Sequence, residues 1–154
     1  MEKKQLKSIP WMPEDFKEFI QCLNSNDVQY LLVGGWAVGI YGHPRATKDI
    51  DFLISIDSEN LEKLQKALFS FGAPPVDLEQ FRERGYVIRI GSSPIQIDLI
   101  NEADGININD CFQRKKIINV DDTDIFLISR NDLIINKKAS GRSTDIADVE
   151  KLEK

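Results

Sequence analysis

The chain has 154 residues, of which 42% are hydrophobic and 29% are charged. This is the length and composition of a globular domain, and it excludes a disordered or fibrous chain. The formal net charge of -5 argues against a non-specific nucleic-acid binder, although it leaves room for a structured RNA docked on a local basic patch. No repeat, low-complexity tract or linker divides the sequence, so a single domain is expected over residues 1–154.

Nothing in the sequence indicates a membrane or an oxidising compartment. No apolar run approaches the roughly 18 residues of a membrane-spanning helix, and the polar N-terminus lacks the pattern of a signal peptide. Cys22 and Cys111 lie far apart and share no metal-ligand spacing. One disulfide could join them, but two reduced thiols are the simpler interpretation. We therefore expect a cytoplasmic protein that makes no membrane contact.

The first part of the chain is expected to form a helix, a strand and a second helix. Apolar residues at helical spacing predict the first helix over about 13–25. The apolar run 30–33 then predicts a short strand, which ends abruptly at Gly34 and Gly35. Residues 36–41 follow as a short helix.

The middle of the chain changes to strand patterns. Alternating apolar residues predict a strand over 47–56, and a helix is expected from about Ser58 to Gly72. The stretch 76–84 fits either a short helix or a loop. Residues 86–90 and 95–100 then predict a β-hairpin.

The last part combines two short strands with two helices. The strands are expected over 117–120 and 124–128, and the helices over about 130–153. Ser129 is expected to cap the first of these helices and Ser143 the second. Strands interleaved with helices, together with the hairpin, predict an α/β (α+β) domain whose mixed β-sheet is flanked by helices.

Three aspartates carry the candidate chemistry. Asp49 and Asp51 alternate along one strand, so their carboxylates share a face and lie about 7 Å apart at the backbone. Asp98 points to the polar face of the second hairpin strand. Carboxylates that close repel one another unless a cation lies between them. Mg²⁺ suits such a site because it takes oxygen ligands and keeps room for phosphates, and a third carboxylate would let two metals share it.

Asp49 and Asp51 also have a simpler interpretation, as the solvent-facing residues of a half-exposed strand. The glycines upstream favour the functional interpretation. Gly34 and Gly35 stand at a strand-to-helix turn, where backbone N–H groups can approach a phosphate and the helix N-terminus favours an anion. The combination of the glycines with the aspartates predicts a site for phosphoryl transfer.

The segment 32–52, in which the glycine pair is followed by Asp-Ile-Asp, resembles the signature of the polymerase-beta-type nucleotidyltransferase superfamily. The Gly-x-x-Arg-x-Thr-x-Asp-Ile-Asp run over 42–51 is similar to the small bacterial nucleotidyltransferases of the abortive-infection and toxin–antitoxin group. The tail 132–148 is similar to the closing Lys-x-Ala-x-Gly-Arg-x-x-Asp-x-x-Asp pattern of that group. The Gly-Gly-Trp-Ala-Val run over 34–38 is also similar to small antibiotic adenylyltransferases.

The resemblance implies a nucleotidyltransferase fold and the transfer of a nucleoside monophosphate from an NTP, with two Mg²⁺ ions as cofactors. It implies that Asp49, Asp51 and Asp98 are catalytic metal ligands, and that Asp98 is also the base toward the acceptor hydroxyl. The residues implied for nucleotide binding are Gly34, Gly35, Arg45, Thr47, Lys48 and Lys137.

The other charged residues of these motifs have less specific interpretations. Arg45 could grip phosphate oxygens and Lys137 could add a point charge, or both could be ordinary solvated cations. Arg142 with Asp145 and Asp148 is interpreted as an ion-pair network at a helix end rather than as catalytic groups.

Two further residues depart from a catalytic pattern. His43, the only histidine, stands beside a proline in a turn and is interpreted as structural or exposed. Trp36 stands where many superfamily members carry a hydroxyl residue, so backbone amides must contribute more of the phosphate contact.

The acceptor stays open between an RNA end such as that of a tRNA, a protein hydroxyl and a small molecule. A different class of function also stays open, that of a non-catalytic, antitoxin-like or partner-binding module. The chain lacks the large C-terminal helical domain of longer relatives, so a partner subunit or a homodimer is one expectation. The presence of all three carboxylates favours the enzyme.

Overall fold

The computed structural model describes residues 3–5, 12–42, 49–92 and 94–154. The strands are β1 (Lys3–Gln5), β2 (Tyr30–Val33), β3 (Asp49–Ile54), β4 (Val87–Ser92), β5 (Ile95–Ile100), β6 (Lys116–Val120) and β7 (Thr123–Leu127). The α-helices are α1 (Glu14–Ser25), α2 (Gly34–Ile40), α3 (Ser58–Phe71), α4 (Ile108–Gln113), α5 (Arg130–Ser140) and α6 (Ser143–Leu152).

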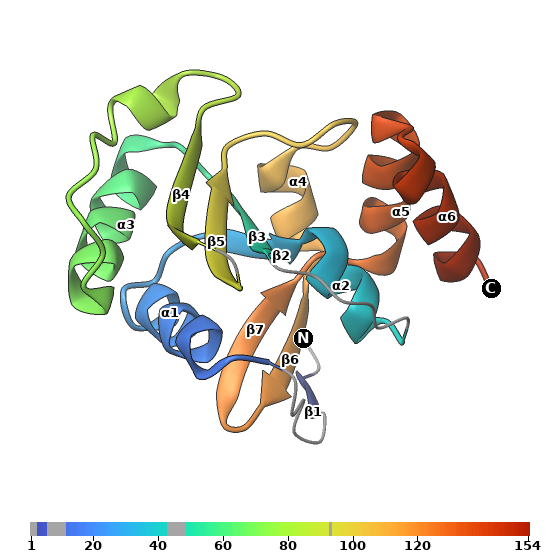
Figure 1. Ribbon diagram of the computed structural model, residues 1–154, viewed down its shortest axis with the longest axis horizontal. Helices are drawn as coiled ribbons and strands as arrows, with labels where there is room; N and C mark the ends of the chain where they lie inside the picture. The colour runs from blue at the N-terminus through green and yellow to red at the C-terminus, as the bar shows by residue number, and fades with distance from the viewer. Residues whose placement is uncertain (1–2, 6–11, 43–48, 93) are drawn as a thin grey trace.

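The strands form one seven-stranded sheet in the order β1-β6-β7-β2-β3-β5-β4. Neighbours pair in parallel at β1/β6, β2/β7 and β3/β5, and in antiparallel fashion at β2/β3, β4/β5 and β6/β7. Helices α1 and α3 lie together at one end of the molecule, and α5 and α6 lie side by side at the other (Figure 1). The expected mixed sheet flanked by helices is therefore confirmed.

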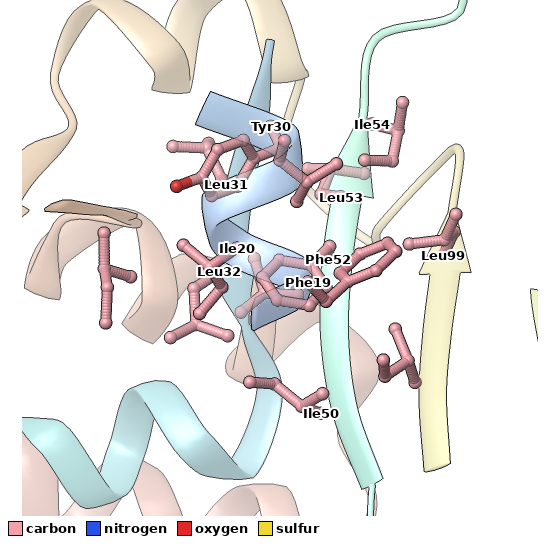
Figure 2. Packing of buried hydrophobic residues seen from close by; sticks show 14 of the residues in the cluster. Phe19, Ile20, Tyr30, Leu31, Leu32, Ile50, Phe52, Leu53, Ile54 and Leu99 are labelled. Atoms are coloured by element: carbon pink, nitrogen blue, oxygen red, sulfur yellow. The ribbon is translucent and has the colours of Figure 1, made fainter. Parts of the chain in front are cut away.

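The core forms where α1 packs onto the central strands. The rings of Phe19 from α1 and Phe52 from β3 lie with their centroids 5.6 Å apart, and Figure 2 shows them side by side among aliphatic neighbours. Tyr30 from β2 completes this aromatic contact, with its ring 5.7 Å from that of Phe52. This packing fixes β3, and therefore its aspartates, in the middle of the sheet.

The burial of β3 differs in one respect from its alternating pattern. Ile50, Phe52 and Ile54 are fully buried, as their shared face predicts. Leu53 was expected on the face of the aspartates, yet it is buried as well. A central strand between β2 and β5 has both faces covered, so its apolar residues are buried whichever way they point.

Several elements differ from the sequence-based expectations in detail. Helix α4 and strand β1 were not predicted, and the ambiguous stretch 76–84 contains a short 3₁₀ helix, Gln80–Arg82. Ser129 caps α5 as expected by accepting a bond from the backbone N–H of Asp132. The N-cap of α6 is Arg142 and not Ser143, because the Asp145 carboxylate turns back to accept the Arg142 N–H.

The cysteines and the helices bear on the expected compartment of the protein. Cys22 and Cys111 are free thiols, as expected. Within the part of the chain that the structure describes, no helix is long and apolar enough to cross a bilayer. The cytoplasmic location and the single-domain organisation over 1–154 stay predictions.

Candidate functional site

Sheet register brings the three aspartates together. Asp49 and Asp51 lie on β3, and the parallel neighbour β5 sets Asp98 directly beside Asp51 in register. Strand alternation keeps all three on the same side of the sheet. The pairing of β3 with β5 therefore brings together Asp51 and Asp98, which lie far apart in the sequence.

A cavity of about 600 Å³ lies between the sheet and the two C-terminal helices. Asp49 and Asp51 contribute carboxylates to it from the sheet, and Lys137 and Arg142 contribute cations from α5 and α6. The segments before β4 and after β5 form the remaining walls, which include Tyr86, Asn101, Glu102 and Asp104. Asp98 lies next to this cavity but is not among the residues that line it.

Gly34 is fitted closely to the carboxylate of Asp51. The strand β2 ends with Val33 paired to Asp51, and Gly34 then adopts a left-handed conformation with φ 71°. A Cβ atom at this position would lie 2.5 Å from Asp51 Oδ2, so the Asp51 carboxylate would have to shift. The glycine is therefore needed for the backbone to turn past the carboxylate, a reason separate from phosphate approach.

The charge on Asp51 is poorly compensated. Burial, together with the neighbouring carboxylates Asp98 and Asp49, raises the pKa of Asp51 to about 6 against the opposing effect of Lys137 and Arg142. Two mutually repelling carboxylates on a cavity wall are the donor set that a divalent cation would neutralise. The chemistry of this wall thus fits Mg²⁺.

Asp98 is engaged by other side chains of the sheet. Its carboxylate accepts bonds from Arg89 Nε at 2.9 Å and from Arg89 Nη2 at 3.4 Å. The Gln96 amide nitrogen lies 3.3 Å from both oxygens. In the described part of the chain, no three His, Cys, Asp or Glu side chains are grouped closely enough to hold a metal ion.

The cations of the cavity belong to a network that joins α5 to α6. Lys137 Nζ lies 3.3 Å from Asp145 Oδ1 and 3.2 Å from Asp148 Oδ2, and all three side chains are at most 6% exposed. Arg142 donates from Nε to Asp145 Oδ2 at 2.8 Å, while its own side chain remains 74% exposed. Burial acts to raise the pKa of Asp145, but the bonds from Arg142 and Lys137 outweigh it and hold that pKa below its usual range.

The structure therefore brings together part of the predicted set. Gly34, Asp49, Asp51 and Lys137 line one cavity. Gly35 lies half-buried in the first turn of α2, and Trp36 is a core residue whose ring meets that of Phe16 edge-on. Four residues singled out in the sequence, His43, Arg45, Thr47 and Lys48, lie outside the described residues.

Sequence reasoning missed Arg89 and set Arg142 aside. A signal for Arg89 exists only once the register is known, because the pairing of Ser92 with Ile95 places residue 89 opposite residue 98. No comparable signal places Arg142 beside the aspartates, since this contact depends on how α5 and α6 pack against the sheet.

Comparison with known proteins shows which family the chain belongs to. A family described as nucleotidyltransferase of unknown function (DUF6036) matches residues 12–153. The chain belongs to this family of nucleotidyltransferases. The superfamily resemblance seen in the sequence is thereby confirmed. The comparison with curated proteins finds no match.

Solved structures share the fold at low sequence identity. The lincosamide antibiotic adenylyltransferase LnuA, solved with lincomycin, superposes with a TM-score of 0.61 at 16% identity, over 92% of this chain and 96% of that one. ANT(2")-Ia, solved with adenylyl-2"-tobramycin, gives 0.58 at 14% identity over 89% and 84%. An antigenic nucleotidyltransferase-like protein from Paracoccidioides brasiliensis gives 0.54 at 16% identity over 88% and 72%. At such identities the likeness establishes the fold alone.

Proposed function

We propose that the chain transfers a nucleoside monophosphate from an NTP to a hydroxyl acceptor and releases pyrophosphate. The observation that carries the proposal is a cavity lined by the carboxylates of Asp49 and Asp51 on the sheet and by positively charged residues of the C-terminal part of the chain. A metal-bound triphosphate needs both, because the metal takes carboxylate oxygens and the phosphates take cations. The volume of about 600 Å³ is that of an ordinary small-ligand site.

The three aspartates would have distinct roles in this reaction. Asp49 and Asp51 would hold Mg²⁺, and Asp98 would be the third ligand that allows a second ion. When bound, Mg²⁺ would neutralise the charge that develops on the transferred phosphorus group and on the leaving pyrophosphate. The Asp98 carboxylate would take the proton of the acceptor hydroxyl, for which Arg89 must first release it.

Two similarities bear on the class of acceptor. The structural neighbours were solved with lincomycin and with adenylyl-2"-tobramycin, which supports a small-molecule hydroxyl. The motif resemblance to the toxin–antitoxin group supports an RNA end or a protein hydroxyl.

Calorimetry tests the nucleotide-binding half of the proposal. Each NTP would be titrated with and without Mg²⁺ into wild type, Asp49→Asn/Asp51→Asn and Glu150→Gln, an exposed residue of α6 that serves as the control. We expect metal-dependent binding of at least one NTP to wild type and to the control, and its loss in the double variant. A well-folded wild type that binds no NTP would contradict the proposal. Binding without transfer to any acceptor would favour the antitoxin-like, partner-binding module, completed by a partner subunit or a second copy.

A further inference from the structure

Arg142 differs from Lys137 in what its charge can reach. Both residues line the cavity, but the Lys137 side chain is 6% exposed and lies between the carboxylates of Asp145 and Asp148. The Arg142 side chain is 74% exposed. A bound anion can therefore meet Arg142 directly, whereas Lys137 is already matched by two buried charges.

The guanidinium of Arg142 is held on one edge and open on the other. Nε and Nη2 donate to Asp145 at 2.8 Å and 3.3 Å, and the Arg142 backbone N–H donates to the same carboxylate at 3.3 Å. Among the described residues, Nη1 makes no hydrogen bond. A planar guanidinium anchored in this way presents its free N–H groups in a fixed direction, the geometry that phosphate oxygens accept best.

We infer that Arg142 is the residue that contacts the triphosphate, and that Asp145 positions it. Lys137 and Asp148 then hold Asp145 in place and join α6 to α5. This inference rests on the proposed function, and it reverses the interpretation of Arg142 as part of a purely structural ion-pair network. Its basis is the exposed cation on the wall of the cavity that also contains Asp49 and Asp51.

The expected effect is a loss of affinity that depends on the phosphate groups. A hydrogen bond to a charged group contributes enough that its removal weakens binding by about ten- to a hundredfold. Arg142→Gln should therefore weaken Mg²⁺-dependent NTP binding by this factor and leave the corresponding nucleoside nearly unaffected. Arg142→Lys should retain part of the affinity, because lysine keeps the positive charge. It should lose the rest, because lysine lacks a planar guanidinium that can bond Asp145 and phosphate at the same time.

The test is calorimetry with the NTP that wild type binds, with its nucleoside and with inorganic tripolyphosphate. Lys138→Gln is the matched control, since Lys138 is an exposed neighbour on α5 that pairs with Glu153 rather than with the cavity. The inference predicts that Arg142→Gln loses affinity for NTP and tripolyphosphate alone, while Lys138→Gln behaves as wild type.

Three results would contradict a contact between Arg142 and the triphosphate. Equal NTP affinity in wild type and Arg142→Gln would remove Arg142 from the phosphate site and leave the proposed function intact. An equal loss for nucleoside and NTP would show that Arg142 shapes the cavity instead of contacting phosphate. Absence of NTP binding by wild type would overturn both this inference and the proposed function.

Discussion

Arg89 and Asp98 face one another across the β4–β5 hairpin, with Arg89 Nε 2.9 Å from Asp98 Oδ1. The Arg89 side chain is 60% exposed and the Asp98 side chain 8% exposed, so Arg89 can move into solvent and leave the Asp98 carboxylate to a cation. Arg89 thus occupies the carboxylate that the proposed reaction assigns to a metal ion.

If Arg89 competes with metal for Asp98, Arg89→Gln should bind divalent cations more tightly. An exposed ion pair is weak, so the expected gain is about two- to fivefold. Mn²⁺ binding without nucleotide, followed by electron paramagnetic resonance, measures this directly. Lys63→Gln, at a half-exposed residue of α3 that pairs with Glu59, should bind Mn²⁺ as wild type does. Unchanged or weaker binding in Arg89→Gln would show that the arginine does not compete.

Asp51→Asn should stabilise the protein at neutral pH in the absence of divalent metal. Burial, Asp98 and Asp49 raise the Asp51 pKa from 3.8 to about 6, against Lys137 and Arg142. Between these values the folded state keeps a proton that the unfolded state releases, so this carboxyl lowers stability as pH rises through about 4 to 6. The gain in Asp51→Asn should be about 1–3 kcal/mol at pH 7.5 and close to nothing at pH 4.

Thermal unfolding in a chelator at both pH values measures this difference. Glu150→Gln, whose carboxyl is exposed on α6, is the control and should follow wild type at both. If Asp51→Asn were only as stable as wild type at pH 7.5, the charge of Asp51 would be compensated in the folded protein.

Gly34→Ala should be more harmful than Gly72→Ala, although both glycines have positive φ. At Gly72 an added Cβ meets nothing within 4 Å, whereas at Gly34 it would lie 2.5 Å from Asp51 Oδ2. Backbone strain alone should lower the stability of either variant by about 1–2 kcal/mol. The displacement of Asp51 should add to this in Gly34→Ala and weaken Mg²⁺-dependent NTP binding there only. Equal effects of the two substitutions in urea unfolding and in NTP titration would contradict the close fit.

Much of this site could be predicted from the sequence, because strand alternation alone places Asp49 and Asp51 on one face. The pairing of Asp51 with Asp98 could not, since a parallel pairing joins segments far apart in the chain and no local pattern specifies it. Helix α4 was missed because it has only six residues, too few for apolar periodicity to show. Strand β1 has three residues and depends on pairing with β6.

Lys137→Met should destabilise the fold strongly, because Lys137 is buried between Asp145 and Asp148. Removing one partner of a buried ion pair lowers the free energy of unfolding by about 3–5 kcal/mol. Urea denaturation measures this loss, and Lys138→Met, on the exposed side of α5, should change stability by less than about 0.5 kcal/mol. Adding Asp148→Asn to Lys137→Met should restore part of the loss. A Lys137→Met protein as stable as wild type would show that the network does not join α5 to α6.

Nucleotidyl transfer is tested most directly by following which labelled phosphate of the NTP reaches an acceptor. Wild type would be incubated with Mg²⁺ and either α- or γ-phosphate-labelled NTP, together with RNA, protein and small-molecule fractions of a cell extract. We predict that the α-label joins an acceptor in one fraction, that the γ-label leaves as pyrophosphate, and that Asp49→Asn/Asp51→Asn transfers neither. Transfer of the γ-label, equal transfer by the double variant, or no transfer by well-folded wild type would contradict the account.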